Sequence, residues 1–157
     1  MPGSDNREEY SMAFVSVTRL RLRSILFLPR FGWLNEGAVR QIVKSPGFRE
    51  GRLLLDANLV LWTMTSWDSE IDMRSFRDRS AHRTVMPKLA AWCVEASVAR
   101  FPDRAGLPTW DEAHAQMVSS GSPSKVGQPS PHHATLAFPP IRWRIERKLV
   151  PSIFRGR

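Results

Sequence analysis

Residues 14–23 read FVSVTRLRLR, a stretch that alternates residue by residue and begins with β-branched types. This pattern predicts a β-strand with two different faces. The face suited to packing under helices carries Phe14, Ser16, Thr18, Leu20 and Leu22. The opposite face begins apolar, becomes cationic, and carries Val15, Val17, Arg19, Arg21 and Arg23.

The next segments predict a helix and a hairpin. Apolar residues spaced for one face of a helix occur within residues 28–44, and Pro46-Gly47 ends that segment. Residues 48–55 and 59–67 have strand character, and the Asp and Asn of residues 56–58 suit a tight turn between them. The strand at 59–67, LVLWTMTSW, is apolar on both faces, which is typical of a central, covered strand.

A second helix and a last strand complete the pattern. Asp68 or Ser69 caps the helix, and its phase shifts near residues 78–80. An apolar stripe resumes after the shift, Pro87 interrupts it, and residues 95–101 predict a strand. The order is therefore β-α-β-β-α-β, which predicts an α+β, ferredoxin-like fold.

One face of such a sheet has no helices. Val15, Val17 and the two-sided strand at 59–67 make that face apolar. A second copy of the sheet is the simplest cover, so the sequence predicts a homodimer in the form of a dimeric α/β barrel.

The two ends of the chain differ from this middle part. We expect a disordered lead-in at 1–13, a ferredoxin-like domain at 14–102 and an irregular C-terminal extension at 103–157. A capping box at Thr109 starts a short helix in the extension. The expected parts of the extension are a helix at 109–118, a flexible linker at 119–133 and a basic tail at 134–157, which wraps the surface.

Composition narrows the classes of function. The net charge is +8, and about +5 of it lies in the stretch from His132 to Arg157. A basic tail alone is a weak sign of nucleic-acid binding, so we do not expect nucleic acid as a partner. The apolar runs are too short to span a membrane. The single cysteine, Cys93, and the polar, acidic start of the chain are typical of a cytoplasmic protein.

The runs FVSVTRLRLRS and LWTMTSWDSEIDMRSFRDRSAHRTVMPKLAAWCVEASVARF resemble the antibiotic-biosynthesis-monooxygenase-like group of dimeric α/β barrels. The resemblance is greatest to an uncharacterised branch related to spheroidene monooxygenase, and it covers residues 14–101. It implies the fold more specifically than an activity. That superfamily includes cofactor-free monooxygenases, haem proteins, dehydratases, isomerases and regulatory ligand binders.

His82 is the leading candidate for catalysis. It shares an apolar stripe with Val85 and Met86, where burial tunes the pKa of a histidine that acts as a general acid or base. The alternative is a structural histidine that bonds to a backbone carbonyl. In haem-binding members of the resembled superfamily the ligand falls near Met86 instead, a mismatch that argues against haem, which stays only the alternative cofactor. Otherwise Met86 would pack in the core or contact the substrate.

Two aromatic and two cationic residues complete the predicted site. Trp62 and Trp67 have opposite parity on one strand, and either suits a wall against a flat substrate or ordinary core packing. Arg19 and Arg21 suit an anion or enolate if their side faces the interior, and surface ion pairs if it does not. Trp33 and Trp92 are expected in the core.

The sequence thus predicts a cofactor-independent, monooxygenase-like enzyme for an apolar or aromatic small molecule. The catalytic residues would be His82, Arg19 and Arg21, and the substrate-binding residues Trp62, Trp67 and Met86. No metal site is expected, because the chain has one cysteine and His132-His133 lies in a flexible segment. The alternatives are a non-catalytic binding or regulatory barrel and a haem protein.

Overall fold

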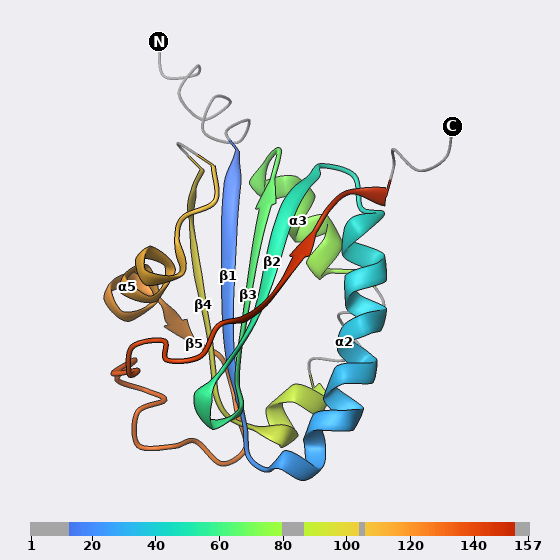
Figure 1. The fold of residues 1–157 in the computed structure, drawn as a ribbon. Helices are drawn as coiled ribbons and strands as arrows, with labels where there is room; N and C mark the ends of the chain where they lie inside the picture. Colours follow the sequence, from blue (N-terminus) through green and yellow to red (C-terminus); the bar gives the residue numbers. More distant parts are fainter. Residues whose placement is uncertain (1–12, 80–86, 104–105, 153–157) are drawn as a thin grey trace.

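The computed structural model describes residues 13–79, 87–103 and 106–152, which form one sheet with helices on both faces (Figure 1). The strands lie in the order β5-β4-β1-β3-β2-β6, and each pair of neighbours is antiparallel. The strands are β1 (Phe14–Leu22), β2 (Phe48–Asp56), β3 (Val60–Trp67), β4 (Cys93–Pro102), β5 (Ser122–Pro123) and β6 (Ile145–Leu149). The helices are η1 (Ile25–Phe27), α2 (Leu28–Val43), η2 (Ala57–Leu59), α3 (Glu70–Arg77) and α5 (Trp110–Ser120).

The central part of this sheet confirms the predicted ferredoxin-like fold. The first predicted strand, β1, lies between β3 and β4, and β2 pairs with β3 in the predicted hairpin. In the tight turn of that hairpin Asn58 and Leu59 adopt left-handed backbone angles, with φ of 63° and 62°. Asparagine tolerates this region better than most residues do, which is why the turn falls there.

The two helices between the strands begin and end where local chemistry predicts. Helix α2 has a proline in its first turn and ends at Val43 with Lys44 as its cap, and Gly47 (φ 82°) then turns the chain into β2. Helix α3 begins after Ser69, whose Oγ accepts a hydrogen bond of 3.2 Å from the Asp72 N–H. It ends at Arg77, in agreement with the predicted break, and residues 87–92 are helical again.

Helices α2 and α3 cover one face of the sheet and bury two apolar clusters against it (Figure 1). The larger cluster contains Val39, Ile42, Phe48, Trp67, Met73, Phe76 and Leu149. The smaller contains Leu22, Phe31 and Cys93, and Trp92 packs against it. The prediction for Trp33 is wrong, because its side chain is 78% exposed on α2, on the opposite side from Val39 and Ile42.

The opposite face is covered by the chain's own extension, and this corrects the reason for expecting a second copy there. Val15, Val17, Trp62 and Met64 are at most 1% exposed beneath α5 and the segment that follows it. Trp110, Ala113 and Met117 of α5 and Phe138 of the later segment supply the contacts. The alternation predicted an apolar face correctly, but intramolecular packing satisfies the need to bury it.

The extension follows both edges of the sheet. After α5, the residues expected to form a flexible linker bond along β4: Ser124 N–H donates to Ala96 O and Ser130 N–H to Val94 O, at 2.7 and 2.9 Å. The chain then crosses the sheet, and β6 pairs with β2 (Figure 1). Two of its cations form ion pairs, Arg144 with Asp111 and Arg147 with Glu36. No helix in the described ranges is long and apolar enough to cross a membrane.

Candidate functional site

A cavity of about 240 Å³ lies between the sheet and the helices that cover it. We call it the sheet–helix cavity. The sheet floor contributes alternate residues of β1 and β3, and on β1 these have the parity predicted to face the helices. Its apolar lining includes Leu20, Phe31, Leu34, Ala38, Ile42, Trp67, Met73, Phe76, Leu89, Ala90, Ala96 and Val98. Its polar lining includes Ser16, Thr18, Asn35, Thr63, Thr65, Arg77, Arg100, Ser124 and Lys125.

Trp67 forms an aromatic wall of this cavity, and its predicted role as a substrate contact stays a prediction. Its ring stacks on Phe76 with centroids 5.5 Å apart and meets Phe48 edge-on at the same separation. The indole Nε1–H donates to Thr65 Oγ1 over 2.9 Å, so the buried polar atom of this ring is satisfied within the wall. The orientation of the ring is therefore fixed from several sides before any ligand arrives.

Two arginines that the sequence did not single out lie at the edge of the cavity. Arg100 lies on β4 and Arg77 at the end of α3, and both line the cavity. Burial, and then the positive charges of Arg77 and Arg74, lower the pKa of Arg100, while Glu70 opposes this effect. No Asp or Glu is among the described residues that line the cavity. The edge is therefore electropositive.

Two other predicted site residues, His82 and Met86, lie outside the described residues. The described residues on both sides of that stretch do line the cavity: Arg77 precedes it and Leu89 follows it. The catalytic assignment of His82 and the contact assigned to Met86 therefore stay predictions. No histidine is among the described lining residues, so these residues add no support for the haem alternative.

Trp62, Arg19 and Arg21 lie on the other face of the sheet, away from Trp67. Trp62 is 1% exposed in the cluster beneath α5, in the core position that was the alternative to a substrate wall. Arg19 pairs with Trp62 in the register of β1 and β3, so their side chains share that face. The structure thus separates the predicted arginines from the sheet–helix cavity.

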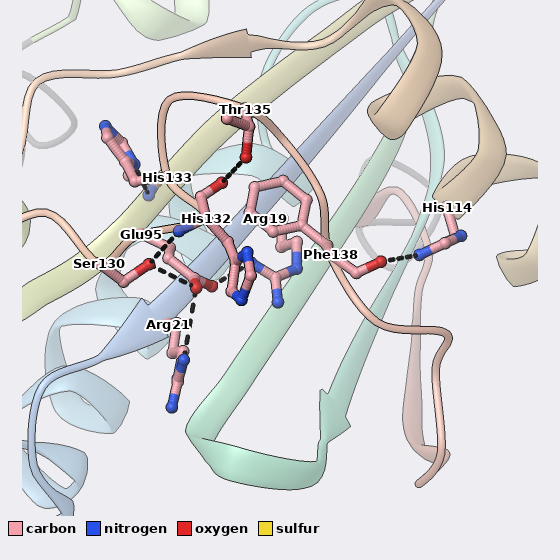
Figure 2. A network of polar contacts seen from close by, with 10 residues as sticks. Arg19, Arg21, Glu95, His114, Ser130, His132, His133, Thr135 and Phe138 are labelled. Carbon is pink, nitrogen blue, oxygen red and sulfur yellow. Dashed lines mark hydrogen bonds and ion pairs between the residues drawn. The ribbon is translucent and has the colours of Figure 1, made fainter.

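On that face Arg19 forms a buried ion pair with Glu95, a residue that the sequence did not single out (Figure 2). Arg19 Nη1 lies 2.5 Å from Glu95 Oε2, and both residues are 2% exposed. Arg21 Nη1 and Ser130 Oγ donate to the other carboxylate oxygen over 3.3 and 2.8 Å. The signal available in the sequence was an acidic residue within an apolar strand, beside a strand whose matching face carries arginines.

The protonation of this pair follows from its surroundings. Burial on its own would raise the pKa of Glu95, but the hydrogen bonds from Arg19 and Ser130 and the charges of Arg19 and Arg21 lower it below the ordinary value. Burial lowers the pKa of Arg19, yet a guanidinium starts so high that it stays charged at neutral pH. The pair is therefore ionised.

Other described side chains that could take part in catalysis are hydrogen-bonded to the backbone or unreactive. His114 Nε2–H donates to Phe138 O over 3.0 Å, and His133 Nδ1 accepts from Ala96 N–H over 3.3 Å (Figure 2). Burial raises the pKa of Cys93 to about 12, so its thiol is not a nucleophile at neutral pH. No group of three His, Cys, Asp or Glu among the described residues is placed to hold a metal ion.

Solved structures share the fold of this chain. SnoaB, a cofactor-independent oxygenase from Streptomyces nogalater, matches with a TM-score of 0.52 and 16% identity over 62% of this chain and 99% of SnoaB. A candidate antibiotic biosynthesis monooxygenase from Nitrosomonas europaea matches with a TM-score of 0.53 and 14% identity over 63% and 95%. A dimeric ferredoxin-like protein from Thermobifida fusca matches with a TM-score of 0.51 and 13% identity over 59% and 92%.

These neighbours confirm the predicted resemblance at the level of fold. They are ferredoxin-like proteins, and antibiotic-biosynthesis-monooxygenase-like proteins are among them. No family model and no curated protein matches the sequence. The alignments include nearly all of each neighbour but leave more than a third of this chain unmatched.

Proposed function

We propose that this chain is a cofactor-independent, monooxygenase-like enzyme that binds an apolar or aromatic small molecule in the sheet–helix cavity. The observation that carries the proposal is the cavity itself, which is apolar, has Trp67 as a fixed aromatic wall, and has cations at its edge. Apolar pockets with a few polar groups are typical of small-molecule sites. The shared fold with SnoaB supports the reaction class by analogy.

The chemistry requires a substrate that supplies its own electrons. A phenol or similar electron-rich ring meets this need, because its oxidation by O₂ to a quinone inserts one oxygen atom and releases the other as water. The reaction begins with removal of a proton from the substrate, which we assign to His82 as general base. Arg100 and Arg77 at the cavity edge would stabilise the resulting anion, in place of Arg19 and Arg21.

A row of hydroxyl groups gives the cavity floor its polarity. Thr18 on β1 is the register partner of Thr63 on β3, and both line the cavity together with Thr65. Hydroxyls of this kind donate to or accept from a phenol oxygen, whichever its protonation state requires. They would orient the ring of the substrate between the sheet and Trp67.

The test measures oxygen consumption and product formation with 1-naphthol and dihydroxynaphthalenes. We expect turnover by the full chain and a loss of at least a hundredfold in His82→Ala, with binding largely retained. Ala38→Phe fills the cavity from α2 and should abolish binding, whereas Arg40→Phe on the exposed side of the same helix should not. Unchanged turnover in His82→Ala would contradict the assignment of His82 as the general base.

A second candidate function is a binding or regulatory barrel without catalysis. The observation in its favour is that the described lining of the cavity contains no histidine, Asp or Glu, and thus no acid–base pair. Binding of 1-naphthol that Ala38→Phe abolishes, without oxygen consumption in the unmodified chain, would support this alternative and exclude the enzyme.

A further inference from the structure

A second pocket, of about 270 Å³, lies on the opposite face of the sheet, between the strands and the C-terminal extension. We call it the extension pocket. Its strand and turn lining is Arg19, Arg21, Asp56, Ala57, Asn58, Val60 and Glu95, and its extension lining is His132, Ala137, Phe138, Pro139, Pro140 and Arg142. We propose that it binds a small organic anion, with a carboxylate or phosphate head and an apolar body.

Both carboxylates of the extension pocket are engaged in the fold. Asp56 Oδ1 accepts three backbone N–H groups, from Ala57 at 2.7 Å and from Arg142 and Trp143 at 2.9 Å each. Its negative charge therefore holds the turn and the crossing segment together. This fixes the backbone of Arg142 at the pocket without engaging its guanidinium.

The second carboxylate, Glu95, is equally occupied. Arg19, Arg21 and Ser130 all donate to it, as Figure 2 shows. Three arginines thus face two carboxylates, and the guanidinium of Arg142 has no partner among the described residues. The three arginines outnumber the two carboxylates, so the pocket has a surplus of positive charge, which favours an anion.

Buried donors without acceptors mark the same part of the sheet. The Arg19 Nε, the Trp62 Nε1 and the Ser97 Oγ have no hydrogen-bond partner among the described residues. Trp62 and Ser97 are the register partners of Arg19 on its two neighbouring strands, so these three groups lie side by side. Buried polar groups are normally paired, and all three of these can donate. This part of the sheet therefore holds unpaired donors, and of the three residues Arg19 also lines the pocket.

The pocket also has an apolar wall. The Phe138 ring lies over the Arg19 guanidinium, with 3.8 Å between Arg19 Cζ and the ring centroid, and holds it in place from the extension side (Figure 2). Val60, Pro139 and Pro140 complete the apolar lining. A ligand with an anionic head at the arginines therefore has space to place an apolar body against these residues.

This site is separate from the sheet–helix cavity and does not depend on the proposed function. Six of its thirteen lining residues come from the extension. The matched neighbours are almost fully covered by alignments to less than two thirds of this chain. The inference is therefore specific to a chain that carries this segment.

Isothermal titration of the full chain at low salt tests the proposal with matched probes. We expect benzoate and phenyl phosphate to bind at least tenfold more tightly than neutral benzamide, because only the first two carry an anionic head. Inorganic phosphate reports the head alone, and we expect it to bind more weakly than phenyl phosphate. Equal affinity for benzoate, phenyl phosphate and benzamide, or no binding of either anion, would overturn the proposal.

Two variants locate the binding. Arg142→Gln and Arg21→Gln should each weaken benzoate binding about tenfold, and the first should leave the melting temperature unchanged because Arg142 is exposed. Arg144→Gln is the control: it removes the same charge two residues away, from an arginine that pairs with Asp111 and does not line the pocket. An equal loss in Arg144→Gln, or no loss in the other two, would show that binding is not in this pocket.

Discussion

The two faces of the sheet are built from alternate residues of the same strands, yet they are covered in different ways. Beneath α2 and α3 the packing leaves an apolar cavity bordered by Trp67 and Phe76. Beneath the extension, the centre of the sheet is tightly packed around Trp62 and Met64, and a buried ion pair lies at one end. The helices between the strands thus leave a cavity on one face, whereas the C-terminal extension fills the centre of the other.

The largest expected effect comes from deleting residues 106–157. This exposes Val15, Val17, Trp62 and Met64. Loss of burial costs about 1.5–3 kcal/mol for each side chain. The total is comparable to the whole free energy of unfolding of a domain. We expect the shortened chain to self-associate or to lose its cooperative melt, as seen by light scattering and circular dichroism.

The control for that deletion removes only residues 150–157, which follow β6. That variant keeps α5, β5 and β6 and should remain close to the full chain in its melt. A monomer with an unchanged melt after deletion of 106–157 would contradict the idea that the extension completes the core.

The next effect is that of Glu95→Leu, which leaves the buried Arg19 without its partner. We expect a loss of about 3–5 kcal/mol in the free energy of unfolding by urea, because an unpaired buried charge is costly. The double variant Arg19→Met/Glu95→Leu should recover most of this loss, since it removes both charges. Additive losses in the double variant would show that the pair is not coupled.

Two methionines compare the packing of the two faces directly. Met64→Ala beneath the extension and Met73→Ala beneath the helices should each destabilise, within the usual range of about 2–5 kcal/mol. Met64 should cost more, because Met73 already borders a cavity and loses fewer neighbouring atoms. A larger loss at Met73, measured by urea unfolding, would reverse the comparison.

The smallest expected effect is a dependence of stability on acid pH. Because the pKa of Glu95 is lower in the folded chain than in the unfolded chain, its contribution is complete above the ordinary carboxyl pKa of about 4.3 and is lost as pH falls through the lower folded value. Melting temperatures from pH 7 to pH 3 should therefore fall less steeply in Glu95→Gln. Parallel curves would contradict the assignment.

The ferredoxin-like part was predictable because its signals are local. The alternation of β1 predicts that Ser16 and Thr18 face the helices. Ser69 caps the start of α3, and Gly47 provides the positive φ needed for the turn before β2. The opposite parity of Trp62 and Trp67 on β3 likewise places them on different faces of the sheet.

The remainder was not predictable because it depends on contacts between distant residues. An apolar face in a pattern says that something covers it but not which chain does so, and so α5 was not expected there. The strand β6 was not predicted, because its charged residues and the prolines near it lack the apolar alternation of a strand. It forms because its backbone pairs with β2, where Arg147 lies opposite Leu53. The role of Glu95 could not be predicted, because it depends on an ion pair with Arg19, 76 positions away in the sequence.

The position of the covering segment along the chain has a consequence for biosynthesis. Every residue of α5, β5 and β6 leaves the ribosome after β4, so the four central strands emerge with one apolar side unprotected. The last pairing, of β6 with β2, joins segments about ninety residues apart and closes a long loop. During that interval the exposed apolar side makes the nascent chain prone to aggregation, and faster elongation or a bound chaperone would reduce this risk.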